Sequence, residues 1–80
     1  MKLKHFEHYD AYRFLLKFEN GTVKETDLEE LIGHHVTLDA LNNARIDPEW
    51  GCLEFNGGRV DIEPKTLYQY ATANHYKEVA

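Results

Sequence analysis

Hydrophobic and polar residues alternate along the first quarter of the chain, and this pattern predicts antiparallel strands. Large apolar side chains occupy every second position between residues 11 and 19: Tyr12, Phe14, Leu16 and Phe18. A period of two places them on one buried face of a strand and leaves the other face wet. Residues 2–9 predict a preceding strand and residues 22–26 a following one. Asn20-Gly21 predicts the hairpin turn before that third strand, because both residues tolerate positive φ.

The next segment predicts a short helix. Asp27 is the expected N-cap, and Glu30 three residues later completes a capping box. The apolar stripe of this helix consists of Leu28, Leu31 and Ile32, and Gly33 is expected to end the helix. Residues 37–43 predict a second helical turn that buries Leu38 and Leu41.

The second half of the chain predicts another hairpin followed by a helix. Short strands are expected at three places: residues 44–47, 52–55 and 60–62. Two glycine-containing turns separate them: Asp47 to Gly51, and Asn56 through Gly57 to Gly58. Pro64 suits the first helical position, where its missing N–H costs nothing. Leu67, Tyr68 and Ala71 then share one helix face, and residues 72–80 are expected to fray.

These elements predict a single α+β domain over residues 1–80. We expect a small antiparallel sheet of roughly five strands, built from hairpins, with two short helices on one face. The expected core is Tyr12, Phe14, Leu16, Phe18, Val23, Leu28, Leu31, Ile46, Leu53, Phe55, Val60, Ile62 and Leu67.

The charge of the chain argues against direct nucleic-acid binding. The net charge is −5, and it is shared between the two halves, with −3 on residues 1–40 and −2 on residues 41–80. Phosphate backbones need clustered basic side chains, and only Lys2 and Lys4 come near to forming a cluster.

The single cysteine and the absence of long apolar runs indicate a cytoplasmic protein. Cys52 has no partner for an intramolecular disulfide, which suits a reducing compartment. No stretch approaches the ~18 apolar residues of a membrane span, and residues 1–10 lack the apolar segment of a signal peptide. We therefore expect no membrane contact.

Residues 55–70 carry a family resemblance. The pattern consists of Phe55, Gly57 or Gly58, Asp61, Ile62, Pro64, Leu67 and Tyr68, and the earlier half adds Asn20, Gly21, Asp27 and Leu28. It resembles a small bacterial family known only as a domain of unknown function. The resemblance implies a small α+β domain that occurs alone or ahead of a helix-turn-helix segment. Stand-alone members look like products of two-gene units, which implies a protein partner, and the family brings no catalytic residues.

The chain departs from the family pattern in two places. Phe55 stands where the family usually has Trp, and the turn from Gly57 to Val60 is one residue longer before Asp61. The register of the last hairpin is therefore open. We expect these 80 residues to leave no room for the helix-turn-helix segment, so the resemblance does not imply DNA binding.

Five histidines and one cysteine raise the question of a metal site or a nucleophile. His34 and His35 are adjacent in a predicted loop, and Cys52 would supply a third ligand, or a nucleophile beside a histidine. Adjacent loop histidines diverge, however, and His5 and His8 point to opposite faces of a strand. The alternative interpretation is polar histidines and a small buried hydrophobe. No cofactor or catalytic residue is assigned.

Aromatic residues supply the other candidate site. Trp50 in its turn is either an interface anchor or a lid over the core, and both interpretations stay open. Tyr68 and Tyr70 are two apart on a helix, so only one of them is expected in the core. The expected interaction surface is Trp50 with Tyr70. Asp61 is expected to hold the strand-to-helix corner through a hydrogen bond.

Two functional hypotheses follow. The first is a non-enzymatic protein-interaction or regulatory module that binds itself or another small protein. The alternative is a small metal-binding or ligand-binding protein, or an enzyme, that uses His34, His35 and Cys52.

Overall fold

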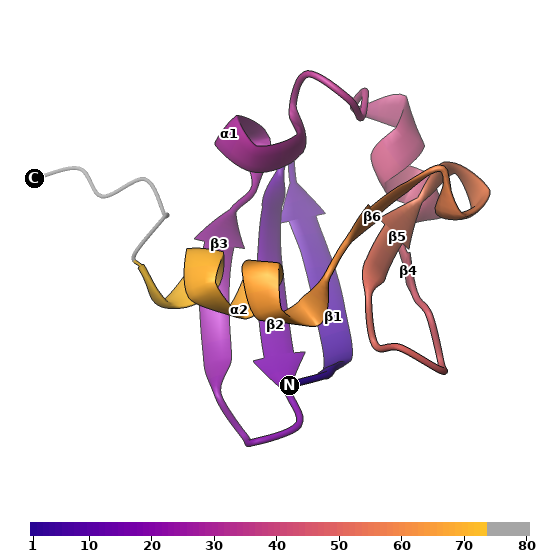
Figure 1. Cartoon of the computed structure of the whole chain (residues 1–80). Helices are drawn as coiled ribbons and strands as arrows, with labels where there is room; N and C mark the ends of the chain where they lie inside the picture. Colours follow the sequence, from indigo (N-terminus) through magenta and orange to yellow (C-terminus); the bar gives the residue numbers. More distant parts are fainter. Residues whose placement is uncertain (74–80) are drawn as a thin grey trace, which may run out of the picture.

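Six short strands and two α-helices make up residues 1–73, which are the residues that the structure, a computed structural model, describes (Figure 1). The strands form two three-stranded antiparallel sheets, ordered β1-β2-β3 and β4-β5-β6, called sheet 1 and sheet 2 below. The elements in chain order are β1 (Leu3–Asp10), β2 (Arg13–Phe18), β3 (Val23–Asp27), α1 (Glu29–Ile32), the 3-10 helix η1 (Asp39–Asn43), β4 (Arg45–Ile46), β5 (Leu53–Phe55), the 3-10 turn η2 (Asn56–Gly58), β6 (Val60–Ile62) and α2 (Pro64–Thr72).

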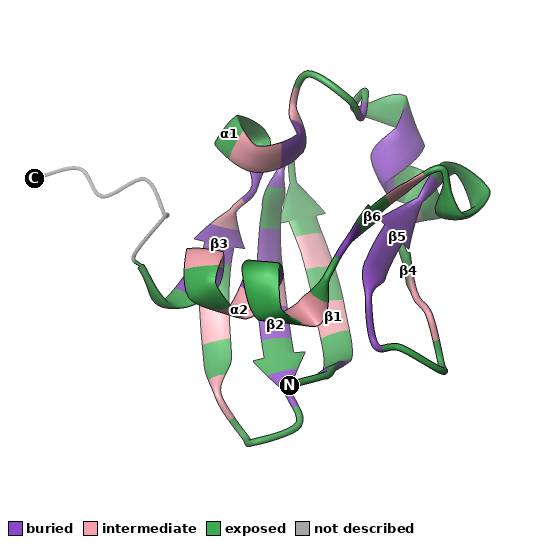
Figure 2. Ribbon diagram, in the orientation of Figure 1, coloured by how far each residue is buried: buried purple, intermediate pink, exposed green. Residues whose placement is uncertain are grey.

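Sheet 1 has one buried face and one exposed face. The register places Phe14 opposite His8 on β1 and opposite Thr26 on β3, which defines the inner face. The predicted burial of the alternating apolar residues is confirmed for Tyr12, Phe14, Leu16 and Phe18 (Figure 2). Tyr12 lies just before β2, and its hydroxyl donates to the Val36 carbonyl at 2.5 Å. The pattern therefore predicted the face correctly, because β2 is the central strand and is covered on one side only.

The β2–β3 turn lies where it was predicted but has a different form. Gly21 has a φ of +89°, whereas Asn20 does not adopt positive φ. The Gly21 N–H donates to the Phe18 carbonyl, and the Phe18 N–H donates to the Thr22 carbonyl, each at 2.9 Å. This is a three-residue loop that ends in a bulge at the glycine, so only one residue needs positive φ.

Val23 was placed in the core, and this prediction is wrong. Its side chain is 48% exposed on the outer face of sheet 1. Since Val23 and Thr26 are three apart on β3, their side chains point to opposite faces, and Thr26 takes the buried position. Leu38 is also exposed, at 57%, because η1 turns Ala40 and Leu41 inward instead.

The first helix begins one residue later than predicted, and the capping box is not formed. Asp27 is still paired with Arg13 in sheet 1, so Leu28 takes the N-cap position of α1. The Asp27 carboxylate accepts a hydrogen bond from the Glu29 N–H at 3.0 Å, which closes a local turn. Asp27 thus orients the start of α1 from the end of β3.

The α+β class is confirmed, but the strands do not form one sheet of about five. The β4–β5–β6 hairpins form their own sheet, which meets β1 through the Leu3 N–H and the Gly51 carbonyl at 3.2 Å. The two sheets share a core in which the Phe14 and Phe55 rings pack edge to face, with centroids 6.3 Å apart. Pairing between distant strands depends on such tertiary contacts, which local patterning does not contain.

Helix α2 crosses in front of sheet 1, whereas α1 lies at the end of that sheet, so the two helices do not share one face (Figure 1). Pro64 opens α2 as predicted, and Leu67 and Ala71 are buried beneath it. We expected residues 72–80 to fray. Of these, Thr72 belongs to α2, and residues 74–80 lie outside the described part of the chain. Within residues 1–73, no helix has the length and apolar character needed to cross a membrane.

Candidate interaction surfaces

Trp50 lies in the turn between β4 and β5 and is 64% exposed. The turn is held by the Asp47 carbonyl, which accepts from the Gly51 N–H at 2.8 Å, and by the Asp47 carboxylate, which accepts from the Glu49 N–H at 2.9 Å. Gly51 closes it with a φ of +74°. Of the two interpretations of Trp50, the lid over the core does not fit this exposure. The indole ring is instead exposed to solvent on a turn whose main chain is held by hydrogen bonds.

Tyr70 lies on α2 and is partly buried. Its hydroxyl donates to the Asp27 carbonyl at 3.4 Å, and burial, followed by the charges of Glu30 and Asp27, raises the pKa of that hydroxyl. Tyr68 is also partly buried, with its ring 5.0 Å from the Phe18 ring in an edge-to-face contact. The expectation that only one of the two tyrosines packs on the core is therefore wrong. Tyr70 joins α2 to the end of β3, at a distance in the fold from the β4–β5 turn (Figure 1).

The candidate metal ligands do not come together. His34 and His35 are exposed in the turn after α1, whereas Cys52 is buried just before β5. On β1, His8 stacks on Phe14 at 4.7 Å, and His5 lies 3.6 Å from the Glu7 carboxylate on the other face. In the described part of the chain, no three His, Cys, Asp or Glu side chains are grouped as a metal ion would require. The alternative function through His34, His35 and Cys52 thus has no assembled site there.

The Cys52 thiol is expected to react slowly. Burial raises its pKa, and the carboxylates of Asp61 and Asp47 raise it further. Because the thiolate is the nucleophile, we expect alkylation by iodoacetamide near neutral pH to be roughly tenfold slower in the folded chain than in concentrated urea. The curve of rate against pH should inflect at higher pH in the folded chain, and mass spectrometry of timed samples measures both. An inflection below that of the unfolded chain would instead indicate an activated cysteine.

Most residues of the family pattern have roles in the fold. The Asn20 side-chain amide donates to the Tyr68 hydroxyl at 3.3 Å, which ties the β2–β3 turn to α2. Gly57 supplies a φ of +67° in η2, and Leu67 is fully buried. Asp61 differs, because its side chain is exposed and the hydrogen bond expected at the strand-to-helix corner is not found within residues 1–73.

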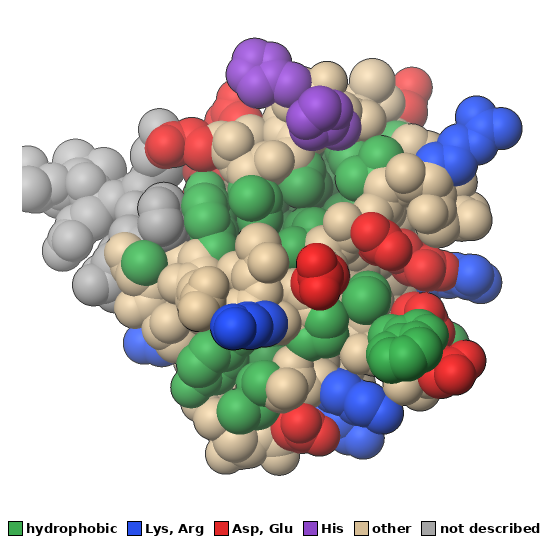
Figure 3. Space-filling view, viewed as in Figure 1, with side chains coloured by type: hydrophobic (Ala, Val, Ile, Leu, Met, Phe, Trp, Pro, Cys, Tyr) green, Lys and Arg blue, Asp and Glu red, His purple; other side chains and the backbone are tan. Residues whose placement is uncertain are grey.

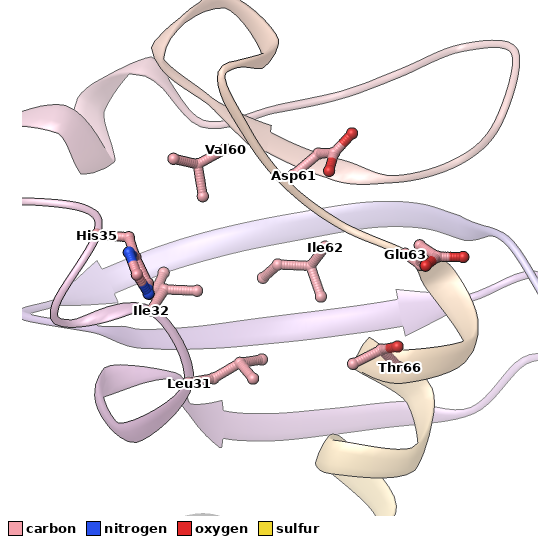
Figure 4. A pocket seen from close by; sticks show the side chains of 8 residues that line it. All are labelled: Leu31, Ile32, His35, Val60, Asp61, Ile62, Glu63 and Thr66. Atoms are coloured by element: carbon pink, nitrogen blue, oxygen red, sulfur yellow. The ribbon is translucent and has the colours of Figure 1, made fainter.

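A pocket of about 250 Å³ lies along β6 and was not predicted from the sequence (Figure 4). It is lined by Leu31, Ile32, His35, Val60, Asp61, Ile62, Glu63 and Thr66. Ile32 and Ile62 are buried and form an apolar floor, while His35, Asp61 and Glu63 are exposed at the rim. On the face shown in Figure 3, hydrophobic side chains gather between α1 and α2, with acidic side chains beside them.

The sequence contains part of the signal for this pocket. Residues 60–63 alternate apolar and acidic side chains, and this alternation indicates a strand with one charged face. The opposite wall comes from α1 and the turn after it, some 25 to 35 positions earlier in the chain. Because the sequence alone gives neither the strand order nor the position of α1, it could not show that these two segments face each other across one pocket.

Comparison with known proteins identifies a matching family. A family model described as "Protein of unknown function (DUF2442)" matches residues 3–73, from β1 to the residue after α2. This agrees with the resemblance to a domain of unknown function expected from residues 55–70. Neither a search of curated proteins nor a search of solved structures finds a match.

Proposed function

We propose that this chain, which belongs to the DUF2442 family of proteins of unknown function, is a non-enzymatic protein-interaction module. The observation that carries the proposal is the exposed indole of Trp50 at the β4–β5 turn. Tryptophan is among the residues that contribute most binding energy at protein interfaces, where a flat aromatic side chain fills a pocket of the partner.

The structure of the turn supports this role. Hydrogen bonds that Asp47 accepts from the Gly51 and Glu49 N–H groups hold the main chain of the turn, and the Leu3 N–H donates to the Gly51 carbonyl at its end. A side chain presented from an ordered turn loses little conformational entropy on binding, so more of the contact energy appears as affinity. Tyr70 does not share this surface, because its hydroxyl contacts the Asp27 carbonyl at the end of β3.

Replacing Trp50 by alanine is expected to abolish capture of a stoichiometric partner without unfolding the domain. A solvent-exposed side chain contributes little to the folded state, so the free energy of unfolding should change by less than about 0.5 kcal/mol. Loss of an aromatic anchor should weaken the complex by roughly tenfold or more. Tagged full chain is used to capture partners from the source cell, and each partner is then purified for calorimetric titration.

Leu38→Ala is the matched control, because Leu38 is a second large apolar side chain that is more than half exposed but lies in the turn before η1. A partner retained by Leu38→Ala and lost by Trp50→Ala supports the proposal. Equal capture by the unsubstituted chain and by Trp50→Ala would remove Trp50 as the anchor, and a chain that purifies without any partner would contradict the interaction module.

A further inference from the structure

Strand β6 is an edge strand with unused main-chain groups. The Asp47 N–H donates to the Cys52 carbonyl at 2.9 Å, so the main-chain groups of Cys52 face β4. Main-chain groups alternate in direction along a strand and therefore point the same way at every second residue. Those of Glu54, two residues after Cys52, face β4 as well. Asp61 stands directly opposite Glu54 and therefore turns its own N–H and C=O away from β5. Within residues 1–73, neither of these two groups makes a hydrogen bond.

This free edge runs along the pocket described above. Four consecutive residues, Val60 to Glu63, line the pocket. Neighbouring side chains of a strand point to opposite faces, so a hollow that touches all four runs along the edge of the strand. Figure 4 shows Leu31, Ile32 and His35 on the far side of it, with Thr66 near the start of α2. An added strand would thus have hydrogen-bonding groups on one side and an apolar floor beneath it.

A row of charges across sheet 2 ends at the same edge. The register places Arg45, Glu54 and Asp61 next to one another on one face of the sheet. Arg45 donates from Nε to the buried Glu54 carboxylate. Asp61 then faces Glu54 with a charge of the same sign, which is unfavourable between directly opposite residues. No ion pair within residues 1–73 compensates Asp61, and Glu63 adds a second acidic side chain two residues later.

We propose that the edge of β6 binds an extended peptide segment of a partner protein in which a Lys or Arg is flanked by apolar residues. The basic residue lies opposite Asp61, exchanges main-chain hydrogen bonds with it, and completes the charge row. Its two neighbours lie opposite Val60 and Ile62 and place their side chains on the apolar floor. Strand addition of this kind takes affinity from main-chain bonds and specificity from alternate side chains.

Charge favours a basic peptide segment at this edge over a second copy of the chain or a nucleic acid. A second copy of the chain brings its own net charge of −5 to an acidic edge, and a nucleic acid brings phosphates. Both are repelled by the carboxylates of Asp61 and Glu63, whereas a basic segment is attracted. The site is separate from the Trp50 turn and goes beyond the role proposed for that turn.

The test is a titration of the isotope-labelled full chain with a defined probe, the blocked hexapeptide Thr-Lys-Val-Lys-Val-Thr, whose second Lys is placed opposite Asp61 and whose first Lys is placed opposite Glu63. We expect saturable shifts of the amide signals of residues 60–63 and slower exchange of the Asp61 amide proton, because a new hydrogen bond covers it. A peptide with Glu in place of both Lys residues should bind at least tenfold more weakly, and a peptide N-methylated at the second Lys, which pairs with Asp61, should lose the protection of the Asp61 amide.

Substitutions in the protein separate a specific site from general attraction. Asp61→Lys should weaken binding of the lysine peptide roughly tenfold. Asp39→Lys changes the net charge equally from an exposed position on η1 and should leave the affinity within about twofold, since exposed distant charges are screened by salt. Asp61→Asn removes the charge without reversing it and serves if the lysine variant is unstable.

Several results would overturn this assignment: no binding at millimolar peptide, equal binding of the Glu peptide, unchanged affinity in Asp61→Lys, or a dimer held together by β6. Trp50→Ala is expected to bind the hexapeptide as the unsubstituted chain does. Loss of the peptide site therefore leaves the Trp50 proposal intact, and failure of the Trp50 proposal leaves the peptide site intact.

Discussion

Replacing Phe14 by alanine is expected to lower the free energy of unfolding by about 3–5 kcal/mol. Phe14 is fully buried on the inner face of β2. The centroid of its ring lies 5.9 Å from that of Phe6 and 4.7 Å from that of His8 in sheet 1, and 6.3 Å from that of Phe55 in sheet 2. Truncation thus removes apolar burial and leaves a cavity where the two sheets meet. In a domain of 80 residues with a total stability of about 4–12 kcal/mol, such a loss brings the chain close to unfolding at room temperature.

Urea denaturation followed by circular dichroism measures the effect, since an exposed Trp50 makes fluorescence a weak probe of unfolding. Leu15→Ala is the control on the same strand, because Leu15 points to the outer face and is only partly buried. It should cost about 1 kcal/mol or less. If Phe14→Ala does not fold, Phe14→Leu keeps most of the volume and should retain a measurable transition. A loss of less than 1 kcal/mol for Phe14→Ala would contradict the shared core of the two sheets.

The burial pattern of β2 could be predicted because it depends on local alternation. β2 lies at the centre of its sheet, so its period of two translated directly into the burial of Phe14, Leu16 and Phe18. Pro64 and Gly21 were also placed correctly, since each meets a local demand of the main chain.

The errors share a long-range cause. Val23 was placed in the core, but the pairing of β3 with β2 turned Thr26 inward instead. Asp27 did not cap α1 as predicted because its main chain was still part of sheet 1. In both cases, tertiary pairing overrode a local preference of a few tenths of a kcal/mol to about 1 kcal/mol.

The candidate sites were less predictable than the fold. Trp50 could be identified as an unusual turn residue, but its exposure depends on whether the turn folds over the core, and the sequence did not decide this. The edge of β6 could be recognised only from the tertiary structure, in which sheet 2 is separate from sheet 1 and α1 lies across the pocket from β6. A surface built from two distant segments requires the tertiary arrangement, whereas a single exposed side chain requires only its own accessibility.

Both proposed sites depend on sheet 2, which is small. β4 has two residues, and β5 and β6 have three each. Strands this short contribute little by themselves, so sheet 2 is supported by its contacts with sheet 1. Two such contacts are the Phe14–Phe55 ring pair and the approach of Lys2 and Leu3 to Gly51. The second contact also positions the turn that presents Trp50.

Replacing Gly51 by alanine is therefore expected to destabilise the domain by about 2–5 kcal/mol. The φ of +74° strains any residue with a Cβ, and an added Cβ would lie 2.6 Å from the Lys2 Cβ and 3.0 Å from the Lys2 Cα. These atoms belong to the main chain or its first side-chain carbon, so they move only if β1 moves. The substitution should also weaken binding of a partner at the Trp50 turn, because the hydrogen bond from the Leu3 N–H to the Gly51 carbonyl is displaced.

Gly21→Ala separates the main-chain strain at positive φ from the steric contact with Lys2. Gly21 has a similar φ of +89°, but no atom lies within 4 Å of an added Cβ. Its substitution should cost only the main-chain strain of about 1–2 kcal/mol. Urea denaturation of both variants gives the difference, which reports the contact between Gly51 and Lys2, the residue before β1. Equal losses at the two positions would show that Lys2 moves away freely. In that case packing against Lys2 does not support the turn, and Trp50 would be ordered by the hydrogen bonds at Asp47 and by the one from the Leu3 N–H.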